Sequence, residues 1–169
     1  MRSLTVAMAA VFFQILSVTS HAQGQTDFTG RWTVIPEQSV MQGAEGLITV
    51  VVFGSDFSVQ REANTLLIRV APHLSPKFRV NLDGTPTTRT EMGPDDRLVR
   101  TSVSATWEDE SLVMHLVEEV VRHGQSVYGQ SRRRLTLNPD HTLRVEMPDG
   151  ENGPMIGSVY RWLEPIPEG

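Results

Sequence analysis

From residue 28 onward, apolar and polar residues alternate with a period of two, in runs rich in Val, Leu, Ile and Thr. This period is typical of β-strands that bury one face, and β-branched residues favour the same structure. Turn-forming residues recur between the runs, as antiparallel folds with many strands require. The alternation predicts strands over residues 28–35, 47–53, 57–61, 65–70, 77–82, 86–91, 97–107, 111–121, 126–137, 142–147 and 158–163.

The breaks between these strands have the composition of hairpin turns. NLDGTP contains Asp83-Gly84, LNPDHTL contains Asn138-Pro139-Asp140, and REANTL and WEDESL are short polar breaks between apolar runs. Such residues favour tight turns. Consecutive hairpins form a meander, and a long meander protects its edge strands best by closing on itself. We therefore predict an all-β fold, an antiparallel meander of about eight to ten strands closed into a barrel.

Two segments interrupt the alternation, and we interpret both as surface loops. They are residues 36–46 (PEQSVMQGAEG) and residues 148–157 (PDGENGPMIG), in which Pro, Gly and acidic residues break any regular period. The first has room for a single helical turn across one end of a barrel.

The first 22 residues have the character of a secretory signal peptide. They contain an early basic residue, Arg2, an uncharged apolar stretch over residues 4–18, and small residues at Ser20 and Ala22. We expect cleavage after Ala22 and a protein that is periplasmic or secreted. The apolar stretch is too short to cross a bilayer comfortably. Residues 23–169 suit a single domain with one hydrophobic core.

Composition narrows the classes of function further. The chain has no cysteine, which excludes disulfides, a thiolate nucleophile and a thiolate metal site. Its net charge of −5 argues against a nucleic-acid partner, because such proteins normally need a concentrated basic surface. No stretch after the first 22 residues is long and apolar enough to span a membrane as a helix.

Gly30 and Trp32 lie on the same face of the first predicted strand, within FTGRWTV. A glycine lets another strand approach closely, and the tryptophan can close one end of a barrel. The pair resembles the Gly-x-Trp signature on the first strand of lipocalins, which are calycin-like barrels. The segments DFTGRWTVIPEQS, ANTLLIRV, VNLDGTP, SATWEDESLVM and LTLNPDHTLRVEM resemble exported bacterial lipocalin-like proteins. The second lipocalin motif, Thr-Asp-x-Tyr, is absent, so the resemblance is to this looser group and not to the core lipocalins.

This resemblance implies a barrel-closing role for three residues and a small, partly apolar ligand inside the barrel. In lipocalins an arginine on a late strand stacks over the tryptophan, and Arg161 in SVYRWLEP is the candidate that would join Gly30 and Trp32. Alternation supplies the candidate lining of a ligand cavity, provided that these side chains do not simply form the core. The candidates are Trp107, Leu112, Met114, Leu116, Glu118, Val145 and Met147.

A second hypothesis is a filled barrel that binds a protein partner, such as an envelope component or a protease, through its two long loops. Catalysis is a weaker hypothesis. Alternation puts Glu118 on an apolar face, and SRRRL offers arginines on both faces of the following strand. No serine stands in a Gly-x-Ser-x-Gly turn, and the histidines have no metal-ligand spacing. The sequence thus favours a binding protein without cofactor or metal over an enzyme.

Overall fold

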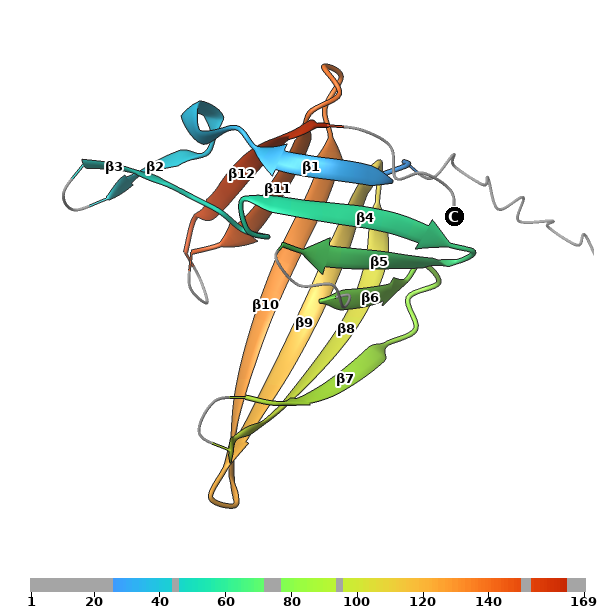
Figure 1. The fold of residues 1–169 in the computed structure, drawn as a ribbon, viewed down its shortest axis with the longest axis vertical. Helices are drawn as coiled ribbons and strands as arrows, with labels where there is room; N and C mark the ends of the chain where they lie inside the picture. The colour runs from blue at the N-terminus through green and yellow to red at the C-terminus, as the bar shows by residue number, and fades with distance from the viewer. Residues whose placement is uncertain (1–25, 44–45, 72–76, 94–95, 150–152, 164–169) are drawn as a thin grey trace, which may run out of the picture.

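The computed structural model of the protein describes residues 26–43, 46–71, 77–93, 96–149 and 153–163. Those residues form an all-β fold, which confirms the fold class predicted from alternation (Figure 1). The predicted signal peptide, residues 1–22, lies outside the described residues, and its cleavage stays a prediction. No helix in the described ranges combines the length and the apolar character needed to cross a membrane.

One antiparallel sheet of ten strands dominates the described part of the chain and is nearly closed into a barrel. Beside it stand a 3-10 helix, η1 (Pro36–Gln38), and a small hairpin of β2 (Val40–Gly43) and β3 (Gly46–Thr49). The large sheet contains, in spatial order, β6 (Phe78–Asn81), β5 (Thr65–Val70), β4 (Asp56–Glu62), β1 (Gly30–Val34), β12 (Met155–Trp162), β11 (Leu143–Pro148), β10 (Gln125–Leu137), β9 (Ser111–Arg122), β8 (Leu98–Glu108) and β7 (Thr87–Met92).

Strand β1 joins two arms of the meander, a short arm of β4 to β6 and a long arm of β7 to β12. It pairs with β12 on one side and with β4 on the other. All other neighbours in the large sheet are consecutive in sequence. The seam lies between β6 and β7, which no backbone ladder joins among the described residues. A hydrogen bond from Thr87 Oγ1 to the carbonyl of Arg79 bridges this seam. The barrel is therefore closed by side-chain packing and this bond.

Inward side chains from both arms meet in one apolar core. The ring of Phe57 makes near-perpendicular contacts with Phe53 and Tyr160, with centroid distances of 5.2 and 4.8 Å. Each aliphatic or aromatic side chain buried in this way stabilises the fold by about 1.5–3 kcal/mol, so the core can hold the barrel without disulfides. Other buried members are Trp32, Val59, Leu66, Ile68, Phe78, Val80, Val103, Ala105, Leu112, Met114, Leu135, Leu143 and Val145.

The Gly-x-Trp pair on β1 is part of this packing. Trp32 is buried, and its indole Nε1 donates a hydrogen bond of 3.0 Å to the carbonyl of Phe28. Gly30 has a φ of +144°, and a Cβ atom at this position would lie only 2.2 Å from Nε1 of Trp162. Glycine is required there because the Trp162 indole packs directly against the β1 backbone.

The register of β1 and β12 determines which side chain shares a face with Trp32. Trp162 pairs with Trp32, whereas Arg161 pairs with Thr33. Directly paired residues lie on the same face of a sheet and successive residues on opposite faces. Arg161 is therefore on the opposite face from Trp32 and does not stack over it. The β12 residue beside the Gly-x-Trp pair is Trp162.

The two segments interpreted as loops contain more regular structure than the sequence suggests. In the first segment, residues 36–38 form a helical turn, as the sequence allows, and β2 begins at Val40. In the second segment, β12 begins at Met155. The expected strand over residues 47–53 ends at Thr49. Beyond it, hydroxyl groups replace a strand ladder: Ser158 Oγ donates to the carbonyl of Val50, and the Phe53 N–H donates to the Tyr160 hydroxyl at 3.2 Å.

We expect Gly30→Ala to lower the free energy of unfolding by about 1–3 kcal/mol, because the new Cβ meets the Trp162 indole at a positive φ. Urea denaturation measures the change. Gly129→Ala is the matched control, since a Cβ at that glycine meets no heavy atom within 4 Å. Equal effects of the two substitutions would contradict this account of Gly30.

Candidate functional site

The strands of the two arms differ in length, and this difference leaves part of the inner surface without an opposite strand among the described residues. Strands β8, β9 and β10 have 11, 12 and 13 residues, whereas β4, β5 and β6 have 7, 6 and 4. At about 3.3 Å per residue, β9 is roughly twice as long as β5. In Figure 1 the long strands continue well past β6 toward the β9–β10 turn. The inner face of their distal halves is the candidate site.

A groove of about 710 Å³ lies on this inner face. The volume falls within the roughly 300–1,000 Å³ typical of small-molecule sites. Strands β7 to β10 form its walls, and Lys77 and Phe78 border it beside the core. The rest of its lining mixes apolar, basic, acidic and neutral polar residues. They are Arg89, Glu91, Gly93, Arg97, Val99, Thr101, Leu116, Glu118, Val120, Val127, Tyr128, Gly129, Gln130, Ser131 and Arg133.

Arg133 stands where the groove meets the core. Its guanidinium carbon lies 5.0 Å from the ring centroid of Phe53 and 5.0 Å from that of Phe78. Nε and Nη1 of Arg133 are buried and have no hydrogen-bond partner in the described part of the chain. Burial lowers the pKa of Arg133, but an arginine remains charged under physiological conditions. The end of the groove thus holds a cation that is desolvated and incompletely satisfied.

The acidic groups of the groove do not hydrogen-bond to the two buried nitrogens of this cation. Glu118 lies on the same face of the sheet and raises the pKa of Arg133 electrostatically, but neither buried nitrogen of Arg133 hydrogen-bonds to it. Glu91 forms an ion pair of 2.7 Å with Arg89 on its own strand. Basic residues outnumber acidic ones among the groove side chains, although the whole chain has a net charge of −5.

The structure separates the residues that alternation suggested as a ligand lining. Leu112, Met114 and Val145 are fully buried members of the apolar core. Leu116 is 6% exposed and borders both the core and the groove, and Glu118 lies in the groove wall. Of these five residues, the structure thus brings only Leu116 and Glu118 to the groove. A role in ligand binding stays a prediction for all of them.

The two remaining candidates lie away from the groove. Trp107 is half-buried, and its ring stacks on Phe28 with a centroid distance of 5.9 Å. Met147 is half-buried on β11, where it pairs with Ile156 of β12. Sequence reasoning did not select Arg133 or Phe78 as site residues. The signal for Arg133 was present, because SRRRL puts its middle arginine on the face opposite its two neighbours.

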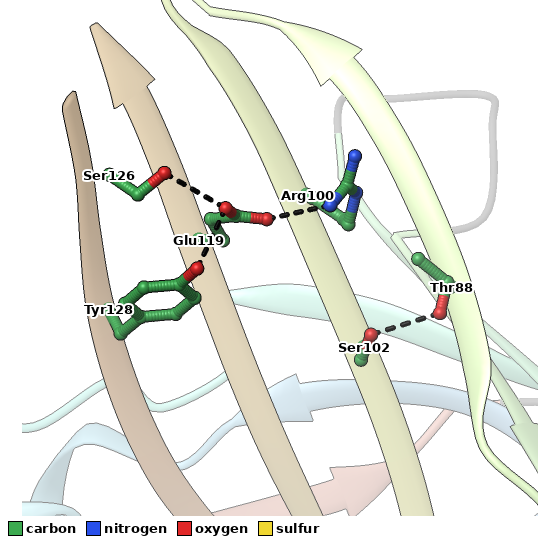
Figure 2. Close-up of polar contacts among 6 residues, drawn as sticks. All are labelled: Thr88, Arg100, Ser102, Glu119, Ser126 and Tyr128. Atoms are coloured by element: carbon green, nitrogen blue, oxygen red, sulfur yellow. Dashed lines mark hydrogen bonds and ion pairs between the residues drawn. The ribbon is translucent and has the colours of Figure 1, made fainter. Parts of the chain in front are cut away.

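The outer face of the long strands carries a polar network centred on Glu119, shown in Figure 2. The carboxylate of Glu119 accepts hydrogen bonds from Arg100 at 2.8 Å and from Ser126 and Tyr128 at 3.0 Å each. These partners come from β8 and β10, on either side of β9. The network therefore links three strands beyond the end of the apolar core. It lies on the outer face of the sheet, opposite the groove.

The described residues offer no other obvious chemical site. No group of three or more His, Asp or Glu side chains among them is arranged to hold a metal ion. His115 is exposed and pairs with Arg132, so it lies on the outer face with that residue.

Comparison of the chain with protein-family models, with characterised proteins and with solved structures finds no match in any of the three. Functional inference therefore depends on the geometry and charge of the groove.

We expect Glu119→Gln to destabilise the protein at neutral pH and to lose this effect in acid. Hydrogen bonds from Tyr128 and Ser126 and the charge of Arg100 lower the pKa of Glu119 below its usual 4.5. A carboxylate with a lowered pKa stabilises the folded state above its ordinary pKa, and this contribution disappears as the pH falls through the lowered value. Urea denaturation between pH 7 and pH 3 tests this, with exposed Glu110→Gln as control. A pH-independent difference would contradict it.

Proposed function

We propose that the protein is an exported, lipocalin-like carrier, periplasmic or secreted, that binds a small, partly apolar molecule in the groove of β7 to β10. The observation that carries this proposal is a groove of about 710 Å³ beside a continuous apolar core. A barrel-like β fold is compatible with such a function. The apolar and polar side chains of the groove are the mixture that small-molecule sites use for affinity and orientation.

The groove is a better ligand site than the centre of the barrel. Leu112, Met114 and Val145 are fully buried in the core, so a ligand there would have to displace packed side chains. In the groove, Val120 and Val127 already offer apolar surface beyond the core. A ligand can cover this surface without any rearrangement of the barrel, which also allows exchange without unfolding.

Binding of a neutral fluorescent probe, N-phenyl-1-naphthylamine, tests the proposal. We expect saturable fluorescence enhancement with the native protein and at least a tenfold loss of affinity in Gly129→Phe, because a side chain at Gly129 enters open space in the groove. Val117→Phe is the control, since it places the same aromatic side chain on the outer face of β9. No binding to the native protein, or equal binding to both variants, would refute a ligand site in the groove.

The β2–β3 hairpin favours a second candidate function, the docking of a protein partner such as an envelope component or a protease. Leu47 and Ile48 on β3 are 72% and 50% exposed, and Val40 on β2, which pairs with Thr49, is 44% exposed. The hairpin extends away from the large sheet (Figure 1). Exposed apolar side chains grouped in this way often mark protein contacts.

A photo-crosslinking residue at position 47 tests the second candidate in expressing cells. We expect one discrete adduct from position 47 and none from position 117, which is also apolar and partly exposed but lies on the outer face of β9. Leu47→Ser together with Ile48→Ser should abolish an adduct formed from position 40 and leave probe binding in the groove unchanged. The absence of any adduct would remove the support for a docked partner.

A further inference from the structure

We propose that Arg133 recognises the carboxylate of the ligand, so that the molecule carried by this protein is an amphipathic carboxylic acid. This inference deepens the proposed function and rests on it. The carboxylate would lie at the end of the groove beside Phe53 and Phe78, and the apolar part of the ligand would extend along β9 and β10 toward their distal turn.

The unsatisfied hydrogen-bonding capacity of Arg133 is the first argument. A buried polar group is normally hydrogen-bonded, and a buried charge is normally paired. Nε and Nη1 are both buried and both lack a partner in the described part of the chain. An incoming carboxylate that reaches the guanidinium would bind one of these two nitrogens together with Nη2, because each planar N–H fork of an arginine contains Nη2.

The two aromatic rings supply the second argument, because they hold the guanidinium in place. The ring centroids of Phe53 and Phe78 each lie 5.0 Å from the guanidinium carbon, and the two ring planes are inclined to each other by 41°. Such contacts stabilise the cation through the ring faces but offer no hydrogen-bond acceptor to its N–H groups. The planar N–H fork of an arginine fits the two oxygens of a carboxylate, which makes a bidentate contact geometrically specific.

Glu118 is the acidic residue of the groove that acts electrostatically on Arg133, and the strand register separates the two backbone positions. Glu118 pairs with Gly129 across the β9–β10 ladder, whereas Arg133 pairs with Met114. The two positions are thus four residues apart along the strand, or about 13 Å at the usual rise per residue. Glu118 can therefore favour the charged form of Arg133 without occupying its N–H groups.

The charge and polarity of the rest of the groove fit an amphipathic anion. Lys77, next to β6, adds basic character at the border with the core. Arg89 on β7 adds it at the level of Glu118, and Arg97 adds it at the distal turn between β7 and β8. The groove walls also include the apolar residues Val99, Leu116, Val120 and Val127. Because the whole chain is acidic, this local excess of positive charge would concentrate anions in the groove and not over the surface generally.

Competition against the neutral probe tests this inference with two molecules of equal chain length, dodecanoate and 1-dodecanol, at pH 8. With the native protein we expect dodecanoate to displace the probe at a concentration at least tenfold below that of 1-dodecanol. Arg133→Met should remove this preference and retain binding of the probe and of the alcohol. Arg133→Lys should keep part of the preference, since it preserves the charge but loses the planar fork.

Arg132→Met is the matched control, because it removes the same charge one residue away on the outer face, where Arg132 pairs with Glu108 at 2.6 Å. It should keep the full preference for dodecanoate. A native protein that binds the alcohol as tightly as the acid, or an Arg133→Met variant that keeps the preference, would overturn the inference and leave the proposed groove function standing.

A direct signal from Arg133 separates failure of this inference from failure of the proposed function. In the native protein, the NMR resonance of the Arg133 Nε–H group should shift on addition of dodecanoate and stay in place with 1-dodecanol. A shift with dodecanoate alone would support carboxylate recognition by Arg133. No shift with dodecanoate would overturn the inference, whatever the probe shows and whether or not Arg133→Met folds.

Discussion

The unequal length of the strands in the two arms of the barrel is the constraint on which the groove depends. Strand β5 has 6 residues and β9 has 12, so within the described ranges a sheet that closes over β5 leaves the distal half of β9 without an opposite strand. The core ends where the short arm ends. Beyond this level the same alternation that buries Leu112 and Met114 presents Glu118 and Val120 on an open surface. Core and groove are two consecutive parts of one continuous face.

A sheet that extends past its core needs support from other interactions. On the outer face, Glu119 links the three long strands through its bonds to Arg100, Ser126 and Tyr128. Cross-strand polar pairs of this kind contribute individually little but add to the backbone ladder. The seam beside β7 has weaker support, because Thr87 and the packing of short β6 replace a ladder there. The groove walls are thus linked by ladders on both sides along β8 to β10, whereas β7 has a ladder on one side only among the described residues.

Alternation and turn composition were sufficient to predict most of this architecture, because both are local properties of the sequence. The strands over residues 65–70, 97–107 and 111–121 agree with β5, β8 and β9 to within about one residue, which is the usual limit for strand boundaries. The face of Glu118 followed from the same alternation. The groove did not, because it depends on which strands lie opposite each other. Whether Arg161 shares a face of the sheet with Trp32 likewise depends on the β1–β12 register, which no local pattern reveals.

The inner end of the groove connects the candidate site to the most irregular part of the barrel. Phe53, which contacts Arg133, lies outside every strand and is held by a hydrogen bond from its N–H to the buried hydroxyl of Tyr160. Burial raises the pKa of Tyr160, which keeps this hydroxyl neutral. Apolar residues of similar volume often replace buried charged groups without loss of stability, so packing against Phe53 and Phe78 does not by itself require a guanidinium at position 133. Function is expected where local features depart from what folding alone favours. The buried nitrogens of Arg133, unpaired within the described ranges, are such a feature, and they lie at the border between core and groove.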